Sequence, residues 1–396
     1  MKKNIVFVLP SLDAGGGEKS LINVLHTIDY SLYEVDLILF HKSGLFLQSV
    51  PSQVKIIEIP GNYQVFKMGL FSSIFTFLKQ LNFKLLFYRL VFAIKNKIIK
   101  NKAVAEQNNW HYIAASIPNF SKKYAAAIGF LEKSSSYLVA DKITATTKIG
   151  WIHTNYSNSG MDKNFDKNYF EKLNYIVAVS AECEADLKQN FHNFSNKIKL
   201  IHNIVSPDLI LEMAKKTEDD STLNNKNLLV TVARLSHEKG VDIALEAAKI
   251  LKENKCSFRW IVIGDGGEKQ QLLKKIADYN LSENFILIGL KQNPYPYVAK
   301  ATIYIQPSRY EGKSIAIDEA KILGRPIIVT NYPSAKDQIE NKINGIIVET
   351  NAVALANAIQ DLLNNETVRD NFTLHLKNEK LGTTKEILKL YDLIDG

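Results

Sequence analysis

The sequence has 396 residues, 46% of them hydrophobic, and a formal net charge of +8. A single hydrophobic core rarely serves a chain of this length, so two domains of similar size are expected. With 23% charged residues and only 10 prolines, the composition excludes a disordered or collagen-like chain.

The chain offers no sign of export or of a membrane span. Its two cysteines, Cys183 and Cys256, fall in different expected domains, which argues against a disulfide scaffold and for a reducing compartment. The apolar run 5–9 is too short for an export signal, and the longest uncharged apolar stretch, 69–78, is too short to cross a bilayer. We therefore expect a cytoplasmic protein.

Short apolar or β-branched runs alternate with longer helical stretches, a pattern typical of parallel sheets covered by helices. Strands are expected at 5–9, 34–40, 125–128, 149–153 and 175–180 in the first half and at 228–233, 260–264, 285–289, 301–306, 327–330 and 345–348 in the second. The polar stretch 206–227 between them lacks strand character and marks the domain boundary. The expected fold class is α/β, with domains at 1–205 and 206–380.

The last residues, 381–396, predict a terminal helix. Thr383 and Glu386 have the spacing of a capping box, in which the side chain of each residue bonds the backbone of the other. Apolar positions with helical spacing follow them.

The most informative segment is YIQPSRYEGKSIAIDEAKILGRPIIVT. A strand ends at Gln306, a loop carries Glu311, and a helix that starts near Ser314 carries Glu319, so the two carboxylates can bind different parts of one ligand. Backbone N–H groups at 313–315 are expected to be free at the helix N-terminus, where they favour phosphate or sugar oxygens. The alternative is a capped surface helix that carries two acids.

A second segment, VTVARLSHEKGVDIALEAA, places Arg234 and Lys239 in a loop between a strand and a helix. A guanidinium and an ammonium there suit a diphosphate and the charge that develops on it as a leaving group. A basic loop at a strand end is by itself more often a solvated face.

Two further features lie in the first half. Gly15, Gly16 and Gly17 follow the first strand and let the backbone approach a phosphate. The spacing G-x-G-x-x-G of a dinucleotide site is not met, which argues against a dehydrogenase. His153 ends the strand of KIGWIHTNY; a lone histidine there is often structural.

Taken together, EGKSIAIDEA, the loop RLSHEKG and the loop GGGE resemble the signature of glycosyltransferase family 4, over nearly the whole chain. The resemblance implies a retaining enzyme of the GT-B fold, in which two Rossmann-like doubly wound domains face each other across a cleft and close on the substrates. It implies an acceptor-side domain at 1–205, a nucleotide-sugar domain at 206–380 and a terminal helix at 381–396 that packs back on the first. The donor would be a UDP- or GDP-sugar, and the acceptor a glycan or lipid-linked glycan of a capsule, O-antigen or cell-wall polymer.

The resemblance also implies residue roles. Glu311 would contact hydroxyls of the transferred sugar, Glu319 the ribose, and His153 the sugar near its reaction centre. Arg234 and Lys239 would hold the diphosphate. The catalytic set is then Glu311, His153, Arg234 and Lys239, and the donor-binding set is Gly16, Gly17, Arg234, Lys239, Glu311, Gly312, Lys313, Ser314, Ile315 and Glu319. Lys313 departs from the family pattern, in which many relatives carry an aromatic residue.

No Asp-x-Asp motif and no cluster with metal-ligand spacing occurs in the sequence, so no metal and no cofactor are expected; the nucleotide sugar is a substrate. The family's retaining chemistry implies front-face displacement, because no supported nucleophile is evident. Two alternatives stay open: a catalytically silent subunit that binds sugar nucleotides, and a Rossmann-type NAD(P) oxidoreductase.

Residues 64–104 contain eight Lys or Arg and no Asp or Glu, so the charge of this segment equals the net charge of +8 of the whole chain. The segment 66–104 is also rich in apolar residues, which suits peripheral contact with an anionic membrane. Its basic residues scatter over more than one helix face at about 100° per residue, so a core helix pair with solvated lysines is an equal alternative. No nucleic-acid-binding module accompanies them, and no nucleic-acid partner is expected.

Overall fold

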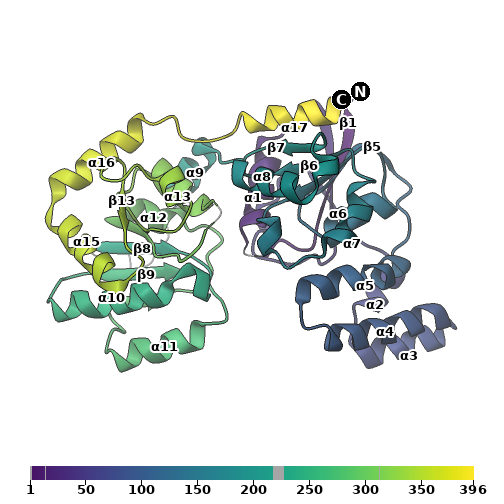
Figure 1. Ribbon diagram of the computed structural model, residues 1–396, viewed down its shortest axis with the longest axis horizontal. Helices are drawn as coiled ribbons and strands as arrows, with labels where there is room; N and C mark the ends of the chain where they lie inside the picture. Colours follow the sequence, from purple (N-terminus) through teal and green to yellow (C-terminus); the bar gives the residue numbers. More distant parts are fainter. Residues whose placement is uncertain (1, 14, 217–226, 312) are drawn as a thin grey trace. The chain divides into compact units, whose positions relative to one another are not determined.

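The computed structural model describes residues 2–13, 15–216, 227–311 and 313–396. The chain divides into two compact units, one formed by residues 1–204 with 384–396 and the other by residues 205–383. Each unit is built on one parallel sheet (Figure 1), so the α/β class expected from the sequence is confirmed.

The first unit contains seven parallel strands in the order β3-β2-β1-β4-β5-β6-β7. The strands are β1 Lys3–Leu9, β2 Tyr33–Leu39, β3 Lys55–Glu58, β4 Lys123–Gly129, β5 Thr144–Ile152, β6 Tyr175–Ala178 and β7 Ile198–Leu200. The helices are α1 Gly16–Thr27, α2 Asn62–Phe66, α3 Leu70–Lys79, α4 Phe83–Ile98, α5 Lys102–Ser116, α6 Ser134–Lys142, α7 Lys163–Phe170, α8 Ala181–Asn190 and α17 Glu386–Asp395.

The second unit contains six parallel strands in the order β10-β9-β8-β11-β12-β13. The strands are β8 Leu228–Val232, β9 Arg259–Ile263, β10 Phe285–Leu287, β11 Ile303–Gln306, β12 Ile327–Thr330 and β13 Ile346–Val348. The helices are α9 Pro207–Ala214, α10 Val241–Glu253, α11 Lys269–Asp278, α12 Tyr295–Lys300, α13 Ile315–Ile322, α14 Ala335–Gln338, α15 Ala352–Asn364 and α16 Glu366–Asn378.

Successive residues of the second sheet point into two different cores. Leu229 of β8 packs in a core with α10 and α15, whereas Leu228 and Val230 pack in a core with α9, α12 and α13. Side chains of a strand alternate between the two faces of its sheet, so both faces of a central strand must be apolar when helices cover both. This is why its strands are continuous apolar runs in the sequence.

Two strands of the first sheet were not expected from the sequence. Both lie at its edges: β3 reads KIIE and β7 reads IKL, and each leaves part of its length exposed. Short edge strands carry charged residues and bury little apolar surface, so their sequence pattern is weak.

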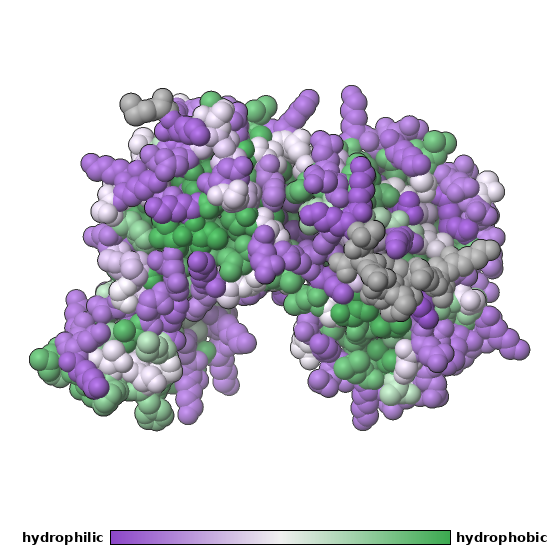
Figure 2. Space-filling view, turned by 180° about the vertical axis from the view of Figure 1, so that it is seen from behind, coloured by the Kyte–Doolittle hydropathy of each residue, from purple (hydrophilic) through white to green (hydrophobic). Residues whose placement is uncertain are grey.

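Helices α2–α5 form a lobe of the first unit with a small core of its own, around Phe66, Phe77 and Leu85. Figure 2 shows this lobe at the lower left, with apolar side chains at its surface. All helices in the described residues are too short or too polar to span a bilayer.

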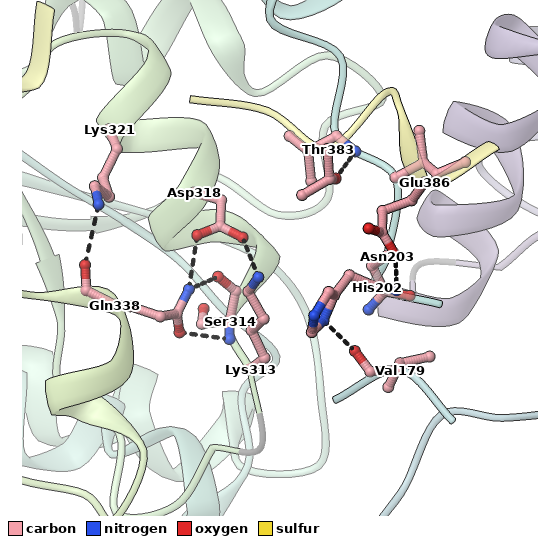
Figure 3. A network of polar contacts seen from close by, with 12 residues as sticks. Val179, His202, Asn203, Lys313, Ser314, Asp318, Lys321, Gln338, Thr383 and Glu386 are labelled. Atoms are coloured by element: carbon pink, nitrogen blue, oxygen red, sulfur yellow. Dashed lines mark hydrogen bonds and ion pairs between the residues drawn. The ribbon is translucent and has the colours of Figure 1, made fainter. Parts of the chain in front are cut away.

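The terminal helix α17 belongs to the first unit, where Ile387, Leu390 and Ile394 enter the main core. The expected capping box is wrong. Glu386 accepts the backbone N–H of His202 at 2.8 Å (Figure 3), and the Thr383 hydroxyl accepts the N–H of Val205 at 2.9 Å. Both side chains therefore bond to the segment that leaves β7, because that backbone offers unpaired donors close by.

Candidate functional site

The best candidate site of the second unit lies where the chain reverses its strand order. β8 and β11 are neighbours in the sheet, although β9 and β10 lie between them in the chain. The chain leaves β8 toward α10 in one core and leaves β11 toward α13 in the other. The two connecting loops diverge at the carboxyl ends of the strands, which is the usual ligand site of an open parallel sheet.

Arg309 ties these two loops together. Its guanidinium donates two hydrogen bonds to Asp242, at 2.7 and 2.6 Å, and one to the carbonyl oxygen of His237 at 2.8 Å. The backbone N–H of Arg309 donates to the carbonyl of Glu238 at 2.8 Å. The hydrogen bonds that it donates to Asp242 raise the pKa of Arg309, as expected of a paired cation. The loop after β11 is thus held against the loop after β8.

Gly240 allows the close approach of the same two loops. It adopts a left-handed backbone, with φ of +63°, and a Cβ at this position would lie 1.9 Å from the carbonyl oxygen of Pro307. No side chain fits there without separating the loops.

Glu311 occupies the space between the two loops and is only 7% exposed. It accepts hydrogen bonds from the Lys239 ammonium at 2.6 Å, the Ser308 hydroxyl at 2.7 Å and the Gln306 amide at 3.0 Å. The Tyr304 hydroxyl donates to the Gln306 carbonyl oxygen at 2.8 Å, which turns the amide nitrogen toward Glu311. These contacts fix the direction of the carboxylate before any ligand binds.

Gln306, Ser308 and Arg309 were not singled out from the sequence. A polar residue such as Gln306 at the end of a buried apolar strand is a usable signal, because buried amides need partners. Arg309 offers no comparable signal, because its partner Asp242 lies in α10, 67 residues earlier in the sequence.

The N-terminus of α13 differs from the expectation of free N–H groups at 313–315. The Gln338 side chain accepts the N–H of Ser314 at 2.9 Å and donates to the Ser314 carbonyl at 2.8 Å and to Asp318 at 2.9 Å (Figure 3). The expectation is wrong for Ser314, because an amide side chain from the next helix occupies its donor. The Lys313 ammonium lies 3.6 Å from a carboxylate oxygen of Asp318. Gly312 falls outside the described residues.

The remaining site residues of this unit differ in exposure. Arg234 is exposed in the loop after β8, whereas Lys239 keeps 26% of its side chain exposed beside Glu311. Ile315 is the first residue of α13. Glu319 lies in the second turn of that helix, is 2% exposed, and accepts the Tyr295 hydroxyl at 2.9 Å. The structure places Arg234, Lys239 and Glu311 in the loops at the carboxyl ends of β8 and β11, whereas Glu319 is buried in α13.

The first unit has a corresponding reversal between β1 and β4. Gly16 and Gly17 begin α1 directly after the loop that leaves β1. A Cβ on Gly17 would lie 2.6 Å from a methyl group of Leu131 and 3.7 Å from the His153 ring, whereas space is open around Gly16. The glycine loop therefore packs against the residues that follow β4 and β5.

His153 is held by Glu132, a residue not singled out from the sequence. The Glu132 carboxylate accepts the backbone N–H of His153, and burial raises its pKa. The His153 ring stacks near Trp151 and Phe130, with centroids 6.2 and 5.0 Å away. Burial lowers the pKa of His153 to about 3, partly offset by a hydrogen bond to the Phe130 backbone. The imidazole is therefore neutral near pH 7.

The unused ring nitrogen of His153 is suited to accept a hydrogen bond. Nε2 is buried and has no hydrogen-bond partner among the described residues. The bond to the Phe130 backbone then falls to Nδ1, which places the proton on Nδ1 and leaves the lone pair on Nε2. Among the same residues, no three His, Cys, Asp or Glu side chains are grouped so that they would hold a metal ion.

Comparison with known proteins gives one family and a set of related folds. Residues 214–378 match the family described as Glycosyl transferases group 1. The chain is 25% identical over 372 residues to N-acetylgalactosamine-N,N'-diacetylbacillosaminyl-diphospho-undecaprenol 4-alpha-N-acetylgalactosaminyltransferase of Campylobacter jejuni, which covers 93% of this chain and 92% of that protein.

Solved structures of GT-B glycosyltransferases share the fold. A glycosyltransferase from Rickettsia africae superposes with a TM-score of 0.66 at 19% identity, over 100% of this chain and 98% of that one. HepE of Anabaena, in complex with UDP and glucose, superposes with a TM-score of 0.68 at 14% identity, over 99% of both chains. The GT-B fold expected from the sequence is thereby confirmed.

The buried His153 predicts a specific dependence of stability on pH. Its folded pKa of about 3 lies below the ordinary value of 6.5, so between these values the unfolded chain binds a proton that the native chain does not. The free energy of unfolding then falls as the pH falls through this window. Urea unfolding should show a steeper loss for the wild type than for His153→Gln, with His375→Gln as the matched exposed control. Parallel pH curves for the wild type and His153→Gln would contradict the burial of a neutral ring.

Proposed function

The chain belongs to the group 1 glycosyltransferases and has the GT-B fold, and from this premise we propose that it is a retaining, metal-independent glycosyltransferase. It transfers a sugar from a nucleoside diphosphate sugar, with UDP or GDP as the nucleotide, to a glycan or lipid-linked acceptor. The observation that carries the proposal is the group formed by the Lys239–Glu311 ion pair and by Arg234, which is exposed in the same loop as Lys239, at the carboxyl ends of β8 and β11.

The diphosphate binds to the cationic side of this group. Arg234 is exposed and presents a planar fork of donors, and the Lys239 ammonium has two N–H donors beyond the one given to Glu311. The positive end of α13 adds to their field at Lys313 and Ile315. This donor set suits two neighbouring phosphates, and it stabilises the charge that forms when the bond to the sugar breaks.

The sugar binds to the acidic side of the group. Glu311 has both carboxylate oxygens fixed by three donors and retains lone-pair capacity for a sugar hydroxyl. Glu319 binds the ribose hydroxyls from within α13, where Tyr295 orients it. In the first unit, His153 offers Nε2 as a neutral hydrogen-bond acceptor.

The reaction proceeds by front-face displacement. The bond from the anomeric carbon to the diphosphate oxygen breaks while the acceptor oxygen bonds to the same face of that carbon. The acceptor proton passes to the leaving phosphate oxygen, which becomes basic as the bond breaks. Arg234 and Lys239 stabilise this oxygen, and Glu311 holds the sugar in place.

The acceptor is an intermediate of a surface glycan, such as a capsule, O-antigen or cell-wall polymer, and the enzyme works at the cytoplasmic face of the membrane. The name of the Campylobacter relative, which spans nearly the whole chain, contains diphospho-undecaprenol, a lipid-linked diphosphate. An acceptor of that kind would keep the enzyme in peripheral contact with the membrane, through residues 66–104.

Replacing Glu311 tests the sugar site. Glu311→Gln keeps the size of the side chain and removes its charge, so transfer should fall by about 100-fold or more while nucleotide affinity stays within about threefold. Initial rates with a panel of UDP- and GDP-sugars measure the effect. Glu366→Gln, at an exposed acid on α16, is the control. Near wild-type turnover in Glu311→Gln would remove Glu311 from the site.

Replacing the basic pair tests the diphosphate site. Arg234→Ala should weaken UDP or GDP binding by about tenfold or more, because it removes charge-assisted hydrogen bonds to phosphate. Lys239→Ala should do the same, although it also unpairs Glu311. Isothermal titration with and without EDTA measures the affinity, with exposed Lys274→Ala as the control. Unchanged affinity in Arg234→Ala, or a firm requirement for magnesium, would contradict the proposal.

A further inference from the structure

The helical hairpin α3–α4 exposes an apolar stripe along both of its helices. On α3 the stripe consists of Phe71, Phe75 and Leu78; on α4 it consists of Phe83, Phe87, Leu90, Ile94 and Ile98. The exposed fractions run from 36% at Leu90 to 86% at Phe71. The spacing of three or four residues places each set on one face of its helix. Figure 2 shows apolar side chains at the surface of this lobe.

The opposite face of each helix supplies the core of the lobe. Phe77 of α3 and Leu85 of α4 are buried with Phe66, about half a turn away from the two stripes at about 100° per residue. The stripes therefore point outward because the inward faces are already packed. We name the two stripes the apolar face, together with Leu81, which is 73% exposed in the turn between the helices.

Lysines lie beside the apolar face. Lys79, Lys84 and Lys95 lie roughly a quarter turn from the stripes on their helices at about 100° per residue. No ion pair joins these three lysines to a carboxylate among the described residues, and Lys79 and Lys95 instead sit 4.5 and 5.0 Å from the rings of Phe75 and Tyr112. Long lysine side chains can thus keep their charge at a polar boundary while the apolar face lies deeper.

The scatter of basic residues that the sequence showed has a structural reason. Arg89 points inward, is 8% exposed, and donates to the carbonyl of Met68 at 2.9 Å. Burial lowers the pKa of its guanidinium. Lys67 is paired with Glu58 at 3.2 Å. Without these two residues, the cations that remain on α3 and α4 flank the stripes.

We infer that the apolar face and its lysines dock on an anionic lipid bilayer. An apolar stripe bordered by unpaired cations matches the boundary between acyl chains and negatively charged headgroups. A second copy of the chain would bring the same cations against each other, and a nucleic acid would leave the aromatic and aliphatic side chains in water. The inference rests on the proposed function only for the purpose of the docking, which is to bring the enzyme to a lipid-linked acceptor.

Vesicle binding of the full chain tests the docking. Flotation with vesicles of about 30% phosphatidylglycerol in phosphatidylcholine should give a partition coefficient about tenfold or more above that for phosphatidylcholine alone. Raising NaCl from about 0.1 to about 0.5 M should weaken the binding without abolishing it, because salt screens the lysines and leaves apolar insertion. Equal binding to both kinds of vesicle would overturn the inference.

Two variants separate the apolar and cationic contributions. Phe75→Ser/Phe87→Ser and Lys79→Glu/Lys84→Glu should each lower the partition coefficient about tenfold or more. The matched control is Val353→Ser/Leu374→Ser, at positions 58% and 59% exposed, against 60% and 59% for Phe75 and Phe87. Binding like that of the wild type in both test variants, or an equal loss in the control, would place the contact elsewhere.

A second measurement reports insertion directly. Phe87→Trp should show a blue shift of its emission on adding anionic vesicles, whereas Leu374→Trp should not; no shift at residue 87 would contradict the docking. Transfer to a water-soluble acceptor should be unchanged in the Phe75→Ser/Phe87→Ser variant, which also checks its fold. Vesicle binding without any transfer by the wild type would sink the proposed function and leave the docking intact.

Discussion

The candidate site depends on one constraint, the tie between the loops that leave β8 and β11. Parallel neighbours whose connections run to opposite faces of the sheet leave a gap at their carboxyl ends. Arg309 holds this gap to a fixed width through Asp242 and the backbone of Glu238, using charge-assisted bonds that are stronger than neutral ones. Because the loops are fixed, Lys239 and Glu311 meet at 2.6 Å without help from a ligand.

The fold could be predicted from the sequence wherever a strand consists of a run of apolar residues. The six strands of the second sheet are continuous apolar runs, and all six expected ranges overlap the observed ones. The two missed strands, β3 and β7, are edge strands whose short mixed sequences bury too little to give a pattern. The end of the chain was predicted as a helix, but Thr383 and Glu386 bond to the backbone at 202–205 and not to each other.

The candidate site could be predicted from the sequence only in part. Motif spacing and the family resemblance predict roles for Arg234, Lys239, Glu311 and His153, each of which follows a strand. They do not identify Glu132 or Gln338, whose roles arise from contacts between segments far apart in sequence. The amphipathic nature of α3 and α4 was hidden for a similar reason: the inward Arg89 blurred the charge pattern of the helical wheel. Tertiary contacts decide which face of a helix packs against the core.

The central claim is that a nucleoside diphosphate binds between the two loops of the second unit. A crystal structure of the chain with bound UDP or GDP tests it most directly. The account predicts phosphate oxygens within hydrogen-bond distance, about 2.7–3.2 Å, of the Arg234 guanidinium and the Lys239 ammonium. A diphosphate that lies away from the carboxyl ends of β8 and β11, or that contacts neither cation, would contradict it.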